Sequence, residues 1–348
     1  MSFKINMHYL FIFFSLICFS GFSQLQTFNH NGTIRNYIYY EPSTISPGAP
    51  LVVVMHGYSG SANGIKNYSG MNTIADINGF AVCYPQGTSD SWNNNFWNVG
   101  YDFHPNETVD DVDFIISLVD FLKNQHNLSS VNTFATGMSN GGEMSYMLAC
   151  QAPQSFSAVA SVAGTMFDSY GASCGTNAVP VMEIHGTNDG INLWNGDYNN
   201  STGWGIFYDI DSIIDFWSAN NQCNQINTEN FPDISPNDGS TVIAEKHFST
   251  TSDNEVWLYK IVNGGHDWPG AFGNMDINSS EHIWLFFSKF LSSTTFEHEN
   301  IAPNAGIKKI LYHTDLLGRK VSFNHKGIII RIYSDGTTEK TLNIDNSY

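Results

Sequence analysis

The chain has 348 residues, enough for one large domain and a small one, and a formal net charge of −18. The charge is uneven: residues 24–300 carry 6 Lys and Arg against 28 Asp and Glu, whereas residues 301–348 carry 7 against 4. So acidic a body repels nucleic acid and anionic membranes, which excludes both as expected partners. The change of sign near residue 300 predicts a domain boundary.

The first residues have the pattern of a secretory signal peptide. Lys4 precedes a short apolar run, and Gly21 and Ser23 supply small residues before a cleavage at Gln24. The run is short for a bilayer span, and no later stretch is long and apolar enough to cross a membrane. We therefore expect residues 1–23 to be removed and the protein to be secreted, without stable membrane insertion.

The remaining chain alternates between strand and helix patterns. A hairpin is expected over residues 27–42, where Asn31-Gly32 favours a tight turn, and a doubly buried strand over residues 49–60. Further strands are expected at 79–85, 129–137, 156–164, 178–186, 241–250 and 255–265, and helices at 72–78, 109–127, 140–150, 206–220 and 281–291. This alternation predicts an α/β fold, with a mostly parallel sheet covered by helices on both faces.

One serine lies between glycines where a strand is followed by a helix. Gly137-Met138-Ser139-Asn140-Gly141 matches G-x-S-x-G, the spacing of a nucleophilic serine on a tight turn. Five-residue matches of this kind are common, so a glycine-rich loop that happens to contain serine is the competing interpretation. The residues that follow the neighbouring strands favour the nucleophile over the loop.

Functional side chains collect at the carboxyl ends of parallel strands. Asp189 follows the strand at 178–186 and His266 follows the strand at 255–265, so the chain order is Ser139, Asp189, His266. A serine hydroxyl needs an imidazole to remove its proton, and the imidazole needs a carboxylate to orient it. We expect these three residues to be catalytic, with Asp197 or Asp267 as alternative acids.

An ester hydrolase also needs backbone N–H groups aimed at the oxyanion of the intermediate. The N–H of Asn140, directly after the serine, is the first expected donor. The loop after the early buried strand should supply the second donor; His56-Gly57-Tyr58, at the end of the apolar run in 49–60, has that placement, and we assign the Tyr58 N–H. His56 is expected to shape this loop rather than to catalyse.

Four cysteines remain after removal of the leader: Cys83, Cys150, Cys174 and Cys223. Four cysteines allow three full pairings in an exported protein. Cys150 and Cys174 flank the segment after the serine motif and are our preferred pair, while the apolar surroundings of Cys83 predict a buried thiol. No Cys/His cluster has zinc spacing, so no metal and no cofactor are expected.

Seven motifs occur in order and together resemble the secreted polyhydroxybutyrate depolymerase and feruloyl esterase-like α/β-hydrolases, relatives of carbohydrate esterases. They are LVVVMHGYSGS, FAVCYPQG, FWNVG…VDDVDFI, ATGMSNGGEMSYMLAC, AVASVAGT, IHGTNDGINLWNG and GGHDWPG, within about residues 27–292. The resemblance implies Ser139 as nucleophile, Asp189 as acid and His266 as base. It also implies Tyr58 and Asn140 at the oxyanion hole and Trp268 beside the acyl or leaving group.

Two details qualify this resemblance. The paired Asp110-Asp111 fits a helix start, where carboxylates are favoured, and not catalysis. Relatives often pair a cysteine at the position of Cys223 with one shortly before the final strand. That second cysteine is absent here, so Cys223 is expected to be free.

The basic tail resembles the C-terminal sorting domain of type IX secretion cargo. Its matching features are D-L-L-G-R at 315–319, K-G-I-I-I at 326–330 and the S-D-G turn at 334–336. We expect a linker at 296–303 and a small all-β domain at 304–348, after a hydrolase domain at 24–295. The resemblance implies the type IX secretion machinery as a partner. A carbohydrate-binding module is the weaker alternative, because the segment is short and poor in aromatic residues.

Several tryptophans fall in predicted loops or at their edges: Trp92, Trp97, Trp194, Trp204 and Trp268. Flat aromatic rings at the mouth of a site suit ferulate, sugars or polyester, so Trp92, Trp97, Trp194 and Trp268 are the candidate substrate-binding residues. We expect a secreted serine ester hydrolase that removes feruloyl or acetyl groups from plant polysaccharides, with polyhydroxybutyrate depolymerase as the alternative. A serine peptidase and a non-catalytic surface-binding protein are more distant alternatives.

Overall fold

The structure is a computed structural model that describes residues 25–170, 173–292, 310–314, 319–321, 327–333 and 338–343. The chain divides into two compact units, Met1–Thr294 and Thr295–Tyr348. The expected signal peptide and linker lie outside the described residues, so both remain predictions.

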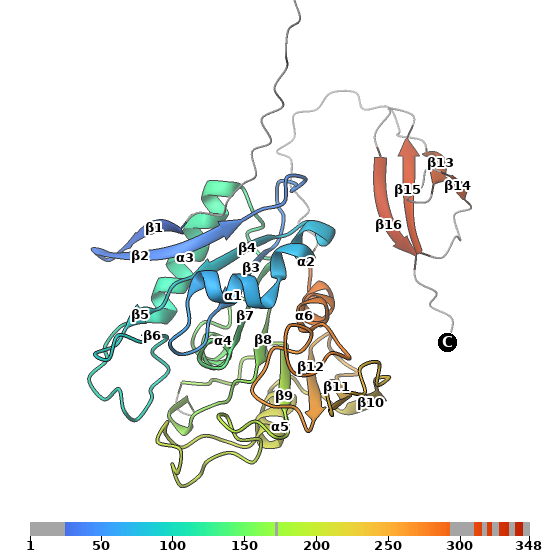
Figure 1. The fold of residues 1–348 in the computed structure, drawn as a ribbon. Coiled ribbons are helices and arrows are strands. Elements are labelled where there is room, and N and C mark those ends of the chain that lie inside the picture. The colour runs from blue at the N-terminus through green and yellow to red at the C-terminus, as the bar shows by residue number, and fades with distance from the viewer. Residues whose placement is uncertain are drawn as a thin grey trace, which may run out of the picture. The chain divides into compact units, whose positions relative to one another are not determined.

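A ten-stranded sheet forms the centre of the first unit, in the order β1-β2-β4-β3-β7-β8-β9-β12-β11-β10 (Figure 1). The six strands from β4 to β12 in this order are parallel, and antiparallel strands extend the sheet at both edges. The strands are β1 Leu25–His30, β2 Thr33–Tyr40, β3 Leu51–Met55, β4 Ala81–Pro85, β7 Thr133–Met138, β8 Ala158–Val162, β9 Val181–Gly186, β10 Gln225–Asn230, β11 Thr241–Phe248 and β12 Glu255–Val262.

Helices cover both faces of this sheet, because its central strands are apolar on both sides. In β3 the residues Leu51 and Val53 face one core while Val52 and Val54 face the other. Helices α3 (Asp111–His126), α4 (Asn140–Gln151) and α5 (Ile210–Asn220) pack on the first face; α1 (Ala62–Ser69), α2 (Met71–Asn78) and α6 (Ser279–Ser288) pack on the second. The predicted fold class is confirmed.

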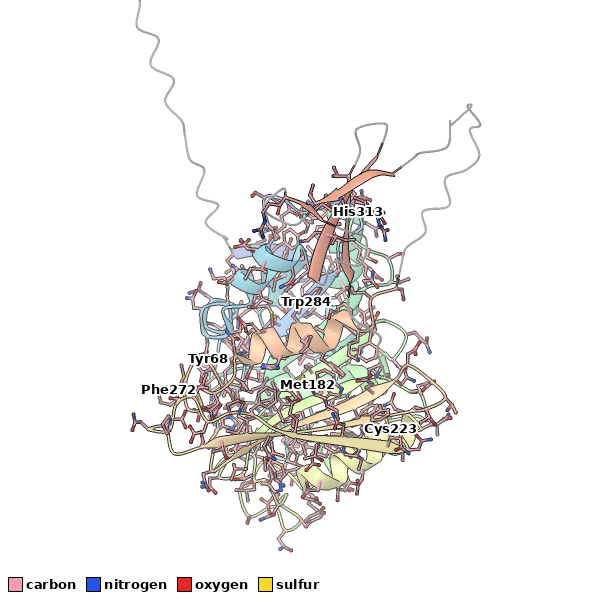
Figure 2. The ribbon with its side chains drawn as sticks, turned by 90° about the vertical axis from the view of Figure 1, so that its right-hand side faces the viewer. Tyr68, Met182, Cys223, Phe272, Trp284 and His313 are labelled. Carbon is pink, nitrogen blue, oxygen red and sulfur yellow. A yellow bond between two sulfur atoms is a disulfide. The ribbon has the colours of Figure 1, made fainter. Side chains whose placement is uncertain are left out.

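Aromatic packing fixes α6 on its face of the sheet. The Trp284 ring stacks on Phe80, with 4.0 Å between ring centroids and 20° between ring planes. Figure 2 shows Trp284 on α6, and Met182 of β9 belongs to the same apolar core. Trp284 therefore has the packing role expected of an apolar residue on a helical stripe.

Asp110 and Asp111 begin α3, as expected. The Asp110 side chain accepts a hydrogen bond from the Asp113 N–H, which caps the helix. Asp111 is buried and binds Arg35 of β2 at 2.7 Å, so this carboxylate joins α3 to the sheet.

A strand, a helix and a two-stranded ribbon were not expected from the sequence. Strand β10 is exposed along its whole length, so it lacks the apolar alternation that marks a strand. Helix α1 precedes α2 as a separate helix, because Gly70 between them adopts a left-handed conformation. A small ribbon of β5 (Thr88–Ser89) and β6 (Asn95–Phe96) folds the long Asn/Trp-rich loop.

The second unit contains a four-stranded antiparallel sheet in the order β14-β13-β15-β16. Its strands are β13 Ile310–Thr314, β14 Lys320–Val321, β15 Gly327–Tyr333 and β16 Thr338–Asn343. A small all-β C-terminal part was expected and is confirmed. Residues 315–318 and 334–336 lie outside the described residues, so the D-L-L-G motif and the S-D-G turn have no structural account here.

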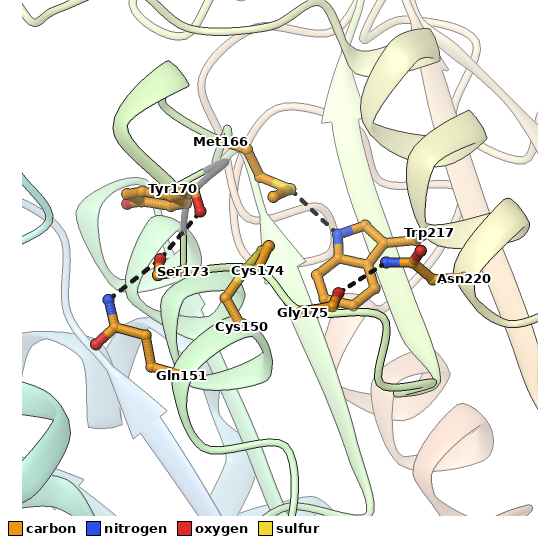
Figure 3. Close-up of a disulfide and its surroundings, with 9 residues drawn as sticks. All are labelled: Cys150, Gln151, Met166, Tyr170, Ser173, Cys174, Gly175, Trp217 and Asn220. Atoms are coloured by element: carbon orange, nitrogen blue, oxygen red, sulfur yellow. Dashed lines mark hydrogen bonds between the residues drawn. A yellow bond between two sulfur atoms is a disulfide. The ribbon is translucent and has the colours of Figure 1, made fainter.

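A disulfide joins Cys150, near the end of α4, to Cys174, as expected (Figure 3). Nearby, the Gln151 side chain donates to the Ser173 hydroxyl, which donates to the Tyr170 carbonyl. Among the described cysteines, Cys83 is a buried thiol and Cys223 is free and partly buried. Within the described part of the chain, no helix has the length and apolarity to cross a membrane.

Candidate active site

Ser139 lies on the turn that joins β7 to α4. Its backbone has φ 54° and ψ −121°, a conformation that residues with side chains rarely adopt. Its amide donates to the Val162 carbonyl of β8, and its carbonyl accepts from the Glu143 N–H. Both bonds hold the strained turn, so the partly exposed side chain is presented beyond the end of the sheet.

Glycines make this turn possible. A Cβ at Gly137 would lie 2.5 Å from the Gly141 carbonyl, and a Cβ at Gly141 would lie 2.3 Å from the Met55 oxygen at the end of β3. Only glycine permits such close approach of three backbone segments. The G-x-S-x-G spacing therefore has a steric reason in this fold.

His266 and Asp189 meet at the same end of the sheet, after β12 and β9. The His266 Nδ1 and the Asp189 Oδ2 lie 2.7 Å apart. The other carboxylate oxygen accepts from the backbone N–H groups of Ile191 and Asn192, which fix the Asp189 side chain. Asp189 is buried, whereas the His266 side chain is 22% exposed and so accessible from solvent.

The two alternative acids are used elsewhere. Asp197 is buried and accepts four hydrogen bonds, from the backbone and side chains of Ser201 and Thr202. Asp267 packs against Gly265 and Gly273, where burial raises the pKa of its carboxyl. Among the described residues, Asp189 is the acid that binds His266.

The loop after β3 approaches the serine. A Cβ at Gly57 would lie 3.3 Å from the Ser139 Cβ, so the backbone just before Tyr58 passes close to the serine. Neither the Tyr58 N–H nor the Asn140 N–H forms a hydrogen bond to another described residue. Two unpaired backbone donors beside a serine are the chemical requirement for binding an oxyanion.

His56 holds the shape of this loop. Its Nδ1 lies 2.7 Å from the Gly57 carbonyl, which can only accept, so Nδ1 carries the proton. Its Nε2 accepts from the Gly87 N–H at 3.0 Å. Burial lowers the pKa of His56 to about 4, so the ring is neutral near pH 7 and positions the loop, as the sequence suggested.

Trp97 is not an exposed ring for substrate, because it is fully buried. Its backbone N–H and carbonyl exchange hydrogen bonds with the Asn140 side chain at 2.7 and 3.1 Å. Its indole N–H donates to the His56 carbonyl at 2.9 Å. Trp97 therefore connects the serine turn to the loop that carries Tyr58.

The other three tryptophans have different positions. Trp268 is also buried, and its indole donates to Ser280 of α6, so it fixes the His266 loop rather than offering a ring face. Trp194 is 8% exposed and packs under the Lys260 ammonium group. Trp92 is 59% exposed and lies 5.9 Å from the Phe103 ring, so it alone of the four presents an open surface.

Phe103 and Trp204 extend this aromatic group to the loop after β3. Ring centroids of Phe103 and Trp204 lie 5.2 Å apart, and those of Tyr58 and Trp204 lie 5.5 Å apart. Trp204 was recognised in the sequence as a loop tryptophan, but Phe103 carried no motif that would distinguish it.

The sequence analysis did not identify four buried polar residues behind the pair of Asp189 and His266. Glu183 and His185 interrupt the apolar strand β9, and this interruption was a usable indication of their importance. Glu143 and Asn192 are joined at 3.0 Å, and the Asn192 N–H also binds Asp189. Burial raises the pKa of Glu143 to about 7, opposed by hydrogen bonds from Tyr101 and Asn192.

Known proteins share this fold and parts of this sequence. The acetyl xylan esterase from Aspergillus awamori superposes with a TM-score of 0.54 over 76% of this chain and 99% of that chain, at 16% identity. Feruloyl esterase D of Neurospora crassa is 24% identical over 266 residues, which cover 76% of this chain and 79% of that protein. The bifunctional acetylxylan esterase/xylanase XynS20E of Neocallimastix patriciarum is 28% identical over 160 residues, 46% of this chain and 22% of that protein.

The α/β sheet and these relatives define a carboxylic ester hydrolase. Residues 35–226, more than half of the chain, match the family described as esterase PHB depolymerase. The chain belongs to that family.

Proposed function

We propose that the protein hydrolyses carboxylic esters with Ser139 as nucleophile, His266 as general base and Asp189 as the acid that orients the base. The observation that carries the proposal is the 2.7 Å contact between His266 and the buried Asp189, at the same sheet end as the strained serine turn. A carboxylate on Nδ1 fixes the imidazole tautomer, so that Nε2 is free to accept a proton.

The reaction then has two halves. The Ser139 oxygen attacks the ester carbon, its proton passes to His266 Nε2, and the Tyr58 and Asn140 N–H groups bind the oxyanion. The intermediate collapses to an acyl-serine as His266 returns the proton to the leaving alcohol. Water attacks the acyl-serine by the same route, which releases the acid and restores the hydroxyl. Ser139 forms no hydrogen bond to His266 in the free enzyme, and such contacts often tighten only in the substrate complex.

The proposed substrates are feruloyl or acetyl esters of plant polysaccharides. The exposed Trp92 and the neighbouring Phe103 and Trp204 rings favour flat aromatic or sugar groups. Polyester is the second candidate, favoured by the family to which the chain belongs.

We also propose that the protein is exported. The apolar leader before Gln24 and the D-L-L-G-R and K-G-I-I-I motifs of the tail support removal of a signal peptide, followed by transport through the type IX secretion machinery. The antiparallel strands β13 to β16 agree with a small β domain in that role.

Replacement of the serine tests the chemistry. Ser139→Ala should lower kcat/KM for p-nitrophenyl acetate by roughly 10⁴-fold or more, because the nucleophile is lost. Ser130→Ala, at an exposed position, is the matched control and should retain full activity. Activity that survives Ser139→Ala would overturn the mechanism.

A substrate panel tests specificity. Mature protein should be assayed on methyl ferulate, acetylated xylan, short p-nitrophenyl esters, polyhydroxybutyrate and a chromogenic peptide. We expect the polysaccharide-type esters to be the better substrates. Faster hydrolysis of polyhydroxybutyrate would favour the polyester as substrate, and faster cleavage of the peptide would contradict both ester functions.

A further inference from the structure

A buried pair of charged side chains lies directly behind Asp189. Glu183 and His185 are two residues apart in β9, on the same side of the strand, and both side chains are fully buried. The His185 Nδ1 lies 2.9 Å from the Glu183 Oε1. No step of ester hydrolysis described above uses either residue, yet an isolated buried charge is costly unless it is paired.

The contacts of His185 assign its protons. Its Nε2 lies 2.8 Å from the Asn192 carbonyl oxygen, which can only accept, so Nε2 carries a proton. Its Nδ1 faces Glu183, whose other oxygen accepts from the Tyr146 hydroxyl at 2.7 Å. Burial raises the pKa of the Glu183 carboxyl, and the hydrogen bonds and charge of its neighbours His185 and Tyr146 oppose burial. With Glu183 as the anion, Nδ1 also carries a proton and the ring is an imidazolium.

This imidazolium is next to the proposed acid. The His185 Nε2 lies 3.6 Å from the Asp189 Oδ2, the same oxygen that lies 2.7 Å from His266 Nδ1. Asp189 is therefore placed between two imidazole rings. A positive charge on the inner ring stabilises the carboxylate and disfavours a second positive charge on the outer ring.

The surroundings of His185 agree with a positive charge. Burial lowers the pKa of His185, but the hydrogen bond and charge of Glu183 and the charge of Asp189 outweigh burial and raise it. From α4, the Tyr146 hydroxyl binds Glu183 and Glu143 faces Asn192.

Two further groups complete the surroundings. Lys260 of β12 is in register with His185, and its ammonium group lies 4.5 Å from the centre of the Trp194 ring. The Trp194 ring also meets the His185 ring edge-on at 6.0 Å, so one indole contacts both groups.

We propose that His185, held as an imidazolium by Glu183, is a positioning residue that keeps Asp189 ionised and extends activity to lower pH by disfavouring protonation of His266. This inference rests on the proposed roles of Asp189 and His266. It adds a second, inner ion pair that determines the acid limit of the reaction.

Removal of the inner charge should change the pH profile. Glu183→Gln keeps the shape of the side chain but removes the anion that holds the second proton on His185, so the ring becomes neutral. His185→Asn removes the cation directly. In each variant the acid limb of kcat/KM for p-nitrophenyl acetate should move to higher pH, which lowers activity about threefold at a fixed pH on that limb. The double variant should match the single variants, because the two residues act as one pair.

Controls separate this role from a structural one. His247→Asn removes a largely buried histidine of β11 that lies 4.0 Å from Glu245 and has no contact with the pair, and its acid limb should not move. A lower kcat at every pH, with an unmoved acid limb, would mean that Glu183 and His185 act only in packing and would overturn the proposal.

The protonation of His185 is also measurable without any variant. In ¹⁵N spectra of histidine-labelled full-length protein at pH 7, both His185 ring nitrogens should appear protonated, with the His185 signal identified by sequential resonance assignment of the wild-type protein. A single unprotonated His185 nitrogen at pH 7 would overturn the inference even if the variants fail to fold. Failure of the proposed function has a different signature, namely activity retained by Ser139→Ala.

Discussion

At the scale of single residues, burial and the neighbouring charges together decide which groups around the site keep a charge. The ring of His56 is buried and neutral near pH 7, whereas the buried His185 has two carboxylates within reach and keeps its charge. Glu143 lies between these cases, because burial raises its pKa to about 7 while Tyr101 and Asn192 donate to it. Its charge therefore changes within the working range of many enzymes.

Glu143 should make stability depend on pH. The folded protein retains a proton that the unfolded chain releases between about pH 4.5 and 7, so the free energy of unfolding falls as pH rises through this window. Glu143→Gln lacks this fall, and its stability relative to wild type should improve by about 2 kcal/mol between pH 5 and 8. Urea unfolding at both pH values measures the difference. Glu281→Gln, at an exposed position, should show no such change; equal behaviour of the two variants would contradict the assignment.

Trp97 should affect catalysis more than substrate binding. Trp97→Phe keeps the buried ring but leaves the His56 carbonyl without its donor, which loosens the loop that carries Tyr58. We expect kcat to fall roughly tenfold with KM little changed. Trp217→Phe removes another buried indole N–H, which binds Met166, and should reduce stability without lowering kcat. Steady-state kinetics of both variants decide the question.

The sequence allowed Ser139, Asp189 and His266 to be predicted at one end of the sheet, because each follows a recognisable strand. It did not allow Trp97 to be placed correctly, because its partners His56 and Asn140 are more than forty residues away. A tryptophan in a predicted loop is therefore not necessarily exposed. Burial of that loop is a tertiary property that local pattern does not contain.

At the scale of elements, most of the strands that were predicted have a buried face, and the exposed β1 was predicted from the Asn31-Gly32 turn that joins it to β2. Strand β3 is buried at every position, whereas β10 is exposed at every position and pairs only with β11 at the edge of the sheet. The alternation of apolar and polar residues in a sequence reflects burial of one face of a strand. An edge strand with polar residues on both faces has no such alternation and cannot be recognised from it. The ribbon of β5 and β6 was missed for another reason, because each strand has only two residues, which is too short for a periodic pattern.

The disulfide fixes the end of α4 to the segment before β9. Replacing both Cys150 and Cys174 by serine frees a loop of 24 residues and should reduce the free energy of unfolding by about 3 kcal/mol. Thermal unfolding with and without a reductant measures this loss. Cys223→Ser, which removes a free thiol, should leave the melting temperature within a few degrees of wild type and still respond to reductant.

At the scale of the whole molecule, the proposed chemistry belongs to the first unit. Every residue assigned to the site lies before Thr294, the last residue of that unit. The end of this unit is fixed by two reciprocal hydrogen bonds between the Asn132 side chain and the Ser292 backbone, at 3.0 and 2.8 Å. These bonds attach the residues after α6 to the start of β7.

A chain that ends at Thr294 should therefore keep full activity on soluble esters and the same thermal unfolding transition for this unit. A chain that ends at Leu291 lacks Ser292, leaves the buried Asn132 amide unpaired, and should melt at a lower temperature by several degrees. Activity assays and calorimetry of the two truncated proteins test this. A large loss of activity in the longer one would show that the C-terminal unit takes part in the site.

The uneven charge also determines where trypsin-like proteases can cut this enzyme. Trypsin-like proteases cut after lysine or arginine, and only six such residues occur between 24 and 300, which leaves long stretches without a cleavage point. One of the six, Arg35, is buried in an ion pair with Asp111. The last 48 residues hold seven. Digestion by such a protease would therefore trim the tail into short peptides while it leaves the catalytic body in large pieces.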